Sequence, residues 1–321
     1  MATMRWNPLA SRWVVLSTAR ASRPEMLAKP GGVCPFCPGS EAQTTETIAA
    51  YGGDEQTWRV RVFRNRYPAF DEVAAPGARG SRGRERPAYG RHEVVVMTPD
   101  HTADPADLSD EQMAHVFRAL ADRMAAHAAA GFAHTQMFVN VGAAAGASLP
   151  HPHGQLIATD VVPPVADREA SQLRGPDCPL CGVADEERDS GPRLVTRNAG
   201  ALLVCPYWSE WPFELLVVPE AHVVAPYAND LVLLGVGRAL RFGLQRLRDA
   251  AGIRDYNVVL HAGPHRAPTP DFFHWHLHVY PRAKPRAGFE LASGMEINEL
   301  RPEAAASRLR AQPKPDEKRA E

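Results

Sequence analysis

Residues 137–155 read MFVNVGAAAGASLPHPHGQ: a strand-like run, a stretch of Gly, Ala and Ser, and a closing His-Pro-His-Gly-Gln. Alternate residues of an extended strand share a face, so His151, His153 and Gln155 should point toward one small volume. The small residues before them allow backbone N–H groups to approach a phosphate closely. Two imidazoles and an amide beside such a loop suggest phosphoryl or nucleotidyl transfer with histidine as the nucleophile. The alternative is a half-buried strand with two incidental histidines, which the adjoining loop and Gln155 disfavour.

The features around this stretch occur twice in the chain. A strand-like run followed by Pro and His at 92–101 recurs at 214–222, and HPH at 151–153 recurs as HWH at 274–276. Each recurrence lies 121 to 123 residues downstream. This constant spacing indicates an internal duplication.

A helical pattern follows the strand-like run in each half. One begins after Ser109 and the other at Asn229 or Asp230, with apolar residues at helical spacing. The expected buried residues are Met113, Val116, Phe117, Leu120 and Met124 in the first helix and Leu233, Val236, Leu240, Leu244 and Leu247 in the second. Two copies of one α+β unit, antiparallel strands with a covering helix, account for the pattern.

The expected division of the chain follows from the duplication. We expect one half at residues 1–165, a second half at 175–311, and a disordered tail rich in Pro and charge at 312–321. Residues 71–90, rich in Gly, Arg, Ala and Pro, are expected to form an inserted surface loop.

Composition excludes several classes of protein. The 321 residues include 36 Lys and Arg against 37 Asp and Glu, so the formal net charge of −1 does not favour a nucleic acid or a membrane as partner. No apolar run reaches the roughly 18 residues that span a bilayer. The amino terminus has no apolar segment typical of a signal peptide, so we expect a cytoplasmic protein.

Four of the five cysteines form two Cys-x-x-Cys pairs, which in a cytosolic chain more often bind metal than form disulfides. Each half also supplies a histidine after the strand-like run and the first histidine of His-x-His. The predicted zinc ligands are Cys34, Cys37, His101 and His151 in the first half and Cys178, Cys181, His222 and His274 in the second.

Alternatives to this assignment remain. His92 competes with His101 as the third ligand, but the duplication favours His101 because His222 is its counterpart. The second site could be vestigial. A thioredoxin-like redox pair is disfavoured, since neither cysteine pair opens a helix after a strand. Cys205 is expected to be a small buried hydrophobe.

Residues 140–155 are nearly the signature of a known family. The chain resembles the galactose-1-phosphate uridylyltransferases of the histidine-triad superfamily over almost its whole length. The resemblance implies two histidine-triad-like halves, with His153 as the nucleophile and Gln155 holding the nucleotidyl phosphate. The substrate-binding residues that it implies are Arg20, Arg23, Asn65, Asn140, Gly146, Ala147, Ser148, Lys284, Ala287, Gly288, Phe289 and Glu290.

The sequence also departs from the family. Arg66 stands where the family often has Asp, which leaves the nucleotide base open. The paired Cys-x-x-Cys motifs look more like the branch with archaeal members and a plant adenylyl-sugar phosphorylase. In some members Glu169, His265, His276 and His278 would match a different second metal site. We favour the cysteine-containing set and expect those four residues to serve the core or the substrate.

The expected reaction moves UMP from UDP-glucose to galactose 1-phosphate through a covalent uridylyl-histidine. A neutral imidazole can attack phosphorus directly, provided that its other nitrogen is held as N–H, most simply by a neighbouring backbone carbonyl. His151 on zinc would make that backbone rigid. The alternatives are a nucleotide-sugar or dinucleotide phosphorylase that uses the same histidine, and a non-catalytic, zinc-stabilised nucleotide-binding module. A homodimer is possible.

Overall fold

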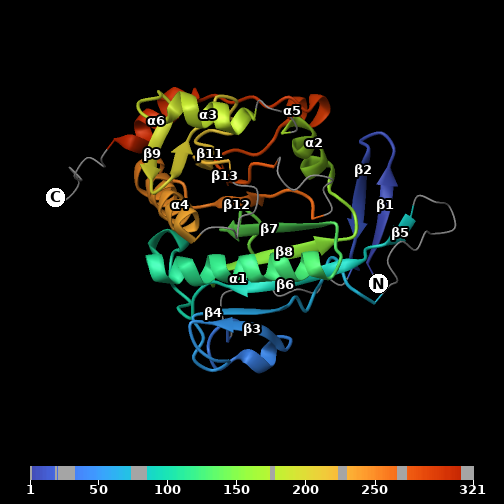
Figure 1. Cartoon of the computed structure of the whole chain (residues 1–321). Helices are drawn as coiled ribbons and strands as arrows, with labels where there is room; N and C mark the ends of the chain where they lie inside the picture. The colour runs from blue at the N-terminus through green and yellow to red at the C-terminus, as the bar shows by residue number, and fades with distance from the viewer. Residues whose placement is uncertain are drawn as a thin grey trace, which may run out of the picture.

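The computed structural model describes residues 2–18, 20, 33–73, 85–173, 178–222, 230–265 and 273–311. Within them, most strands belong to one large antiparallel sheet (Figure 1). Its strands are β3 (Thr47–Tyr51), β4 (Val60–Arg64), β6 (Gly90–Val96), β7 (His134–Val141), β8 (His153–Thr159), β9 (Leu194–Asn198), β10 (Ala201–Val204), β11 (Leu215–Pro219), β12 (Tyr256–His261) and β13 (His276–Pro281). A small second sheet contains β1 (Thr3–Asn7), β2 (Arg12–Leu16) and β5 (Glu85–Pro87).

The large sheet reflects the duplication. Its strand order is β3-β4-β6-β8-β7-β12-β13-β11-β10-β9, so each strand of the first half has a counterpart at the mirrored position in the second. At the centre β7 pairs with β12, and Phe138 lies opposite Val259, 121 residues downstream. This separation equals the spacing of the repeat, which places a pseudo-twofold axis between the two strands. The sheet therefore contains two matching sets of five strands, which join into one continuous sheet.

Two long helices cover one face of the sheet: α1 (Asp110–Ala129) and α4 (Asp230–Ala251) (Figure 1). Ser109 caps α1 as expected, because its hydroxyl accepts a hydrogen bond of 3.0 Å from the backbone N–H of Gln112. Asn229, the other candidate cap, lies outside the described residues. The predicted apolar residues of both helices are buried, apart from Phe117 and Leu233, which are partly buried against the same core.

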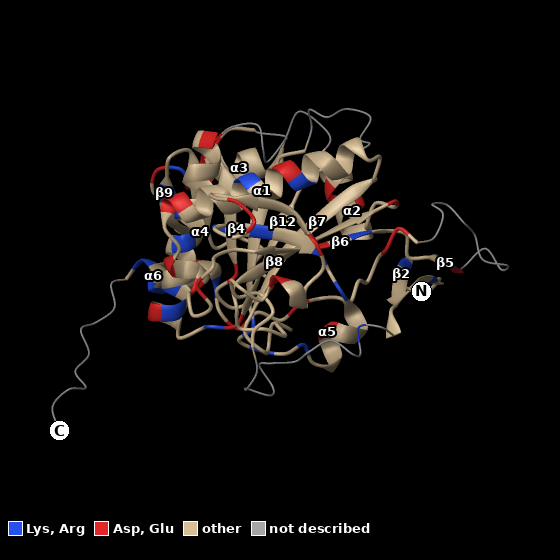
Figure 2. Cartoon of the chain, turned by 90° about the horizontal axis from the view of Figure 1, so that it is seen from below, with Lys and Arg blue, Asp and Glu red and all other residues tan. Residues whose placement is uncertain are grey.

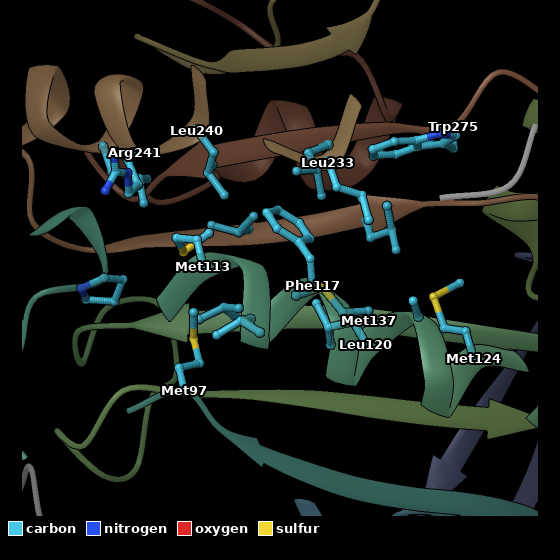
Figure 3. A pocket seen from close by; sticks show the side chains of 18 of the residues that line it. Met97, Met113, Phe117, Leu120, Met124, Met137, Leu233, Leu240, Arg241 and Trp275 are labelled. Atoms are coloured by element: carbon cyan, nitrogen blue, oxygen red, sulfur yellow. The ribbon is translucent and has the colours of Figure 1, made fainter. Parts of the chain in front are cut away.

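A small apolar cavity of about 40 Å³ lies between the two helices and the sheet. Figure 3 shows Met113, Phe117 and Met124 from the first half opposite Leu233, Leu240 and Trp275 from the second. Trp275 is 1% exposed, as expected for a core residue. The main core therefore spans both halves.

The opposite face of the sheet carries a smaller apolar cluster, with His92 beside it. Because strand residues alternate, Val95 packs with the core beneath α1, whereas Val94 and Val96 pack on the other face with Cys34, Phe36 and other residues. His92 shares this second face with Val94.

The remaining helices are α2 (Pro164–Gln172), α3 (Pro179–Glu187), α5 (Gly288–Ser293) and α6 (Pro302–Arg310), with short 3-10 turns η2 (Glu41–Gln43) and η3 (Pro105–Asp107). The expected inserted loop at 71–90 is only partly irregular: residues 74–84 lie outside the described residues, but Glu85–Pro87 forms β5 beside β1. An ion pair between Arg86 and Asp160 holds this strand. The expected tail, 312–321, also lies outside the described residues.

The surface of the described residues carries charges of both signs. Figure 2 shows Lys and Arg interspersed with Asp and Glu over the helices and loops. Among the described helices, none combines the length and the apolar character that crossing a membrane requires.

Candidate active site and metal centres

His153 begins β8, between β6 and β7. Its Nδ1 lies 2.8 Å from the carbonyl oxygen of His151. Because a carbonyl oxygen can only accept, Nδ1 carries the proton and Nε2 keeps its lone pair. Burial lowers the pKa of His153 below its usual value, so the ring is neutral at pH 7. The backbone carbonyl expected to hold the imidazole is thus the one two residues before it.

His153 and Gln155 line a pocket of about 470 Å³. The predicted residues that share this pocket with them are Arg20, Asn65, Gly146, Ala147 and Ser148. Phe36 packs edge-on against the His153 ring, with ring centroids 5.1 Å apart. The structure therefore brings six of the predicted residues into one pocket with the His153 imidazole.

Other predicted residues lie elsewhere. The Asn140 side chain accepts a hydrogen bond of 2.7 Å from Asn257, behind the small-residue loop. Lys284 pairs with Glu299 beside a larger hollow in the second half, and Glu290 accepts a hydrogen bond from the Ala287 backbone at the start of α5. Residues 284–290 do not line the His153 pocket. Arg23 lies outside the described residues.

The small-residue loop, residues 142–148, contains backbone hydrogen bonds of its own that the sequence did not indicate. The backbone N–H groups of Gly146 and Ala147 donate to the carbonyl oxygens of Ala143 and Gly142, at 3.0 and 3.1 Å. These two groups are therefore occupied within the loop. Ser148, which lines the pocket, adds a hydroxyl donor at the end of the loop.

Residues of the second half hold this loop in place. The Asp255 carboxylate accepts a hydrogen bond of 2.7 Å from the Ala144 N–H, and the Asn257 amide donates one of 3.0 Å to the Ala145 carbonyl. Gly142 has a φ of +82°, and a Cβ there would lie 2.3 Å from the Asp255 carboxylate. The first half supplies the pocket, and the second half fixes its loop.

Sequence reasoning placed His92 among possible metal ligands, but the structure gives it another partner. Its Nε2 lies 2.9 Å from Oε1 of Gln155. His92 is absent from the first metal-ligand cluster, whose third ligand is His101 as the duplication indicated. The alternation of side chains along a strand could have indicated this contact. Val94 pairs with Gln155 between β6 and β8, so His92, two residues before Val94, lies on the same face of the sheet as Gln155.

The first candidate metal centre joins three segments of the chain. The ligand atoms of Cys34, Cys37, His101 and His151 all lie within 4.8 Å of one another. The Cys37 sulfur lies 3.4 Å from Nδ1 of His101 and 3.7 Å from Nδ1 of His151. A tetrahedral zinc, with bonds of about 2.3 Å to sulfur and about 2.05 Å to nitrogen, places such atoms about 3.6 Å apart. The donor set fits zinc.

The rest of this centre also suits a cation. Nε2 of His151 donates a hydrogen bond of 2.8 Å to the carbonyl oxygen of Thr98, which directs Nδ1 at the cysteines. Burial and the neighbouring Cys34 sulfur raise the pKa of Cys37 to about 11. A divalent cation supplies the charge that two adjacent thiolates need.

The second cluster repeats this geometry. The Cys181 sulfur lies 3.4 Å from Nδ1 of His222 and 3.6 Å from Nδ1 of His274, and Cys178 completes the set. Nε2 of His274 donates to the carbonyl oxygen of Pro219 at 2.9 Å, as Nε2 of His151 does to Thr98. All four predicted ligands are in place, so both halves can hold a metal ion.

A third cluster contains His261, His276 and His278. The Nδ1 atoms of these rings are bonded, to Glu169 at 2.8 Å, to the carbonyl oxygen of His274 at 3.0 Å and to Glu214 at 3.1 Å respectively. The three Nε2 atoms are thus free to converge, in the arrangement that oriented metal ligands adopt.

This cluster differs in one histidine from the alternative metal set. The alternative metal set contained His265, but Nε2 of His265 lies 2.8 Å from the Thr135 hydroxyl, and His261 takes its place. The reason is the pairing of β12 with β13, which sets His261 opposite His276. The cysteine set that we favoured and this histidine cluster are both present in the structure, so one set of ligands does not exclude the other.

The chain is similar to several known proteins. Residues 1–163 match the family model described as galactose-1-phosphate uridyl transferase, N-terminal domain. An ADP-glucose phosphorylase of Arabidopsis thaliana is 29% identical over 96% of this chain and 92% of its own length. A galactose-1-phosphate uridylyltransferase of Cryptococcus neoformans is 30% identical over 95% of this chain and 89% of its own.

A solved structure extends the comparison to the fold. The ADP-glucose phosphorylase of Arabidopsis thaliana with bound ADP-glucose superposes with a TM-score of 0.79 at 27% identity, covering 97% of this chain and 99% of the other. Together with the family match over half of the chain, these likenesses identify its lineage. This chain belongs to the galactose-1-phosphate uridylyltransferase family.

Proposed function

We propose that this protein moves UMP from UDP-glucose to galactose 1-phosphate through a covalent intermediate on His153. The observation that carries the proposal is the hydrogen bond from Nδ1 of His153 to the His151 carbonyl oxygen, which leaves the Nε2 lone pair available in the pocket. Membership of the family and the curated uridylyltransferase relatives support the same reaction.

The reaction proceeds in two displacements at the α-phosphorus. Nε2 of His153 forms a bond to phosphorus while the bond to the sugar-phosphate oxygen breaks, and glucose 1-phosphate leaves. A phosphate oxygen of galactose 1-phosphate then attacks, the bond from phosphorus to nitrogen breaks, and UDP-galactose leaves. Such a sequence gives ping-pong kinetics.

The surroundings of His153 suit both steps. The ring gains positive charge when it is uridylylated, and the His151 carbonyl oxygen accepts the hydrogen bond from that more acidic Nδ1–H. Gln155, Ser148 and Arg20 line the pocket and supply donors for the phosphate oxygens. The nucleophile needs no general base, because its neutral ring already presents a lone pair.

We propose that the two cysteine-containing clusters hold structural zinc and that the histidine cluster can take a third ion. The support is the donor chemistry: two thiolates and two imidazoles complete a tetrahedral zinc, whereas three imidazoles leave a position open. A zinc ion held by His151 and its three partners would keep rigid the His151 carbonyl that orients His153. Reduced thiolates also favour a cytoplasmic location, where disulfides are rare.

Residues 284–290 contain the predicted sugar-binding residues. They lie outside the His153 pocket of their own chain, and Phe289 is half exposed on α5. We propose that the protein works as a homodimer in which this segment meets the sugar in the pocket of a second copy.

The second candidate is a phosphorylase that uses inorganic phosphate as the acceptor. The observation that favours it is the similarity to the ADP-glucose phosphorylase over 96% of this chain. Arg66 in the pocket rim leaves adenosine and uridine as alternative bases.

Acceptor competition separates the two candidates. Enzyme pre-labelled with radioactive nucleotide from UDP-glucose or ADP-glucose is freed of donor and offered galactose 1-phosphate or inorganic phosphate. We expect rapid transfer of UMP to galactose 1-phosphate and no discharge by phosphate. Release of a nucleoside diphosphate by phosphate alone would assign the protein as a phosphorylase.

A further inference from the structure

His92 is buried on β6, and its two ring nitrogens have distinct roles. Nδ1 lies 3.1 Å from the backbone N–H of Ala69. A backbone N–H can only donate, so Nδ1 is the acceptor and the ring proton resides on Nε2. Burial lowers the pKa of His92 to about 4, so this neutral tautomer is present at pH 7.

This tautomer fixes the side-chain amide of Gln155. Nε2–H of His92 donates to Oε1 of Gln155 at 2.9 Å. The oxygen of the amide is thereby turned toward His92, and its NH2 group is turned away. A reversed amide would offer an acceptor where a phosphate oxygen needs a donor.

A backbone N–H group also fixes the orientation of the Asn65 side-chain amide. Its Oδ1 accepts a hydrogen bond of 2.8 Å from the Tyr67 N–H, so its Nδ2 is the amide nitrogen. That nitrogen lies 3.3 Å from Nε2 of His92. Both atoms carry protons in the tautomer described, so this is a contact between donors. The Asn65 amide remains available to the pocket that it lines.

The second half uses the equivalent position in the same way. Glu214 follows His92 by 122 residues, and His278 follows Gln155 by 123. Glu214 accepts a hydrogen bond of 3.1 Å from Nδ1 of His278, which turns Nε2 of that ring toward the histidine cluster. In both halves, a side chain from the neighbouring strand region orients the third residue of the motif.

We propose that His92 is a positioning residue that holds Gln155 with its NH2 group toward the phosphate being transferred. The inference rests on the proposed function. A chain of hydrogen bonds then determines which group of Gln155 faces the phosphate. Ala69 sets the tautomer of His92, His92 sets the direction of the Gln155 amide, and the amide donates to the phosphate.

The test measures how fast wild type and variants form nucleotidyl-His153 in a single turnover. His92→Met removes the donor at similar volume, whereas His92→Gln places an amide N–H near the position of Nε2. We expect His92→Met to slow adduct formation about tenfold, which is the loss of roughly one oriented hydrogen bond. His92→Gln should restore the rate to within about threefold of wild type.

A double-mutant cycle separates positioning from general packing. In a Gln155→Ala background, where no amide remains to be held, His92→Met should cost no further rate. His134→Met is the matched control, because His134 is equally buried on β7 and its ring has no hydrogen-bond partner among the described residues. Its adduct rate should match that of wild type.

Each outcome is decisive. If His92→Met matches wild type, or if it costs as much rate without Gln155 as with it, the inference is wrong. If His92→Met does not fold, His92→Asn replaces it, since its shorter side chain can still accept from Ala69 but does not reach Gln155. If wild type forms no adduct with UDP-glucose or ADP-glucose, the proposed function itself fails and the inference falls with it.

Discussion

The two histidines of the HPH motif use their ring nitrogens in opposite ways. His151 directs Nδ1 at the cysteines and bonds Nε2 to Thr98, whereas His153 bonds Nδ1 to the His151 carbonyl and keeps Nε2 for the pocket. One peptide carbonyl thus links the candidate zinc site to the candidate nucleophile. The backbone bond of the His153 ring could be predicted from the sequence, because it is made to a carbonyl only two residues away.

The role of His92 could not be predicted in the same way. Its tautomer depends on the N–H of Ala69, 23 residues away, and its partner Gln155 is 63 residues away. The pairing register of β6 with β8 creates the contact with Gln155. The duplication already favoured His101 over His92 as the metal ligand, but it did not indicate the contacts that His92 makes instead.

At the scale of single residues, the loop glycines give a matched pair. Gly142 and Gly146 both have φ near +80°, but a Cβ would collide with Asp255 only at Gly142. We expect Gly146→Ala to lower the free energy of unfolding by about 1 kcal/mol, through backbone strain alone. Gly142→Ala should cost about 3 kcal/mol, because overpacking adds to that strain.

Chemical denaturation measures both glycine variants. Gly142→Ala should also slow adduct formation, since Asp255 must leave the Ala144 N–H to make room. Equal losses of stability in the two variants would show that Asp255 does not restrain the loop.

At the scale of elements, the two cysteine clusters differ in what they connect. The first joins the loop at Cys34 and Cys37 to His101 after β6 and to His151, two residues before the candidate nucleophile. The second ties α3 to His222 and His274, in the half that lacks the His153 pocket. The first site should therefore affect chemistry, and the second should affect stability.

Replacing one cysteine in each cluster tests this difference. Cys34→Ser and Cys178→Ser should each lose about one zinc per chain, measured by mass spectrometry of the metal. Cys34→Ser should slow adduct formation tenfold or more, to roughly the extent seen when metal surroundings are disturbed. Cys178→Ser should lower the melting temperature with a much smaller loss of rate. A loss of rate that is equal in both variants would contradict the proposed division.

Several elements could be predicted and others could not. The duplication identified both cysteine clusters and both covering helices, because each depends on spacing that repeats in the chain. Local composition suggested that residues 71–90 form a loop, but β1 recruits Glu85–Pro87 as a strand. The alternative metal set named His265 where the structure has His261, because the β12–β13 register that sets His261 opposite His276 leaves no local sequence signal.

At the scale of the whole molecule, the duplication produced one sheet with two different sites. Strands β7 and β12 are each the last strand of their own half. They pair across the pseudo-twofold axis, so neither half leaves that edge exposed. Asn257 joins Asn140 and the small-residue loop across this junction, and Arg282 donates to Asn257 at 2.5 Å. The sequence predicted two copies, but the merging of their sheets depends on a long-range pairing of strands.

The second half retains the hydrogen bond from the second histidine of His-x-His to the backbone, but the ring of that histidine has different neighbours. His276 bonds Nδ1 to the His274 carbonyl at 3.0 Å, as His153 bonds to His151 at 2.8 Å. Its ring faces His261 and His278, and burial lowers its pKa well below the usual value. The nucleophile position of the first half has become a candidate metal-ligand position in the second.

The central claim is that His153 carries the nucleotide, and mass spectrometry tests it most directly. The whole protein is incubated with UDP-glucose or ADP-glucose, its intact mass is measured, and the modified peptide is mapped under conditions that preserve a phosphorus–nitrogen bond. The account predicts one added nucleotidyl group per chain, located on His153 and absent from His153→Gly. No mass increase with either donor, or a nucleotide on a different residue, would contradict it.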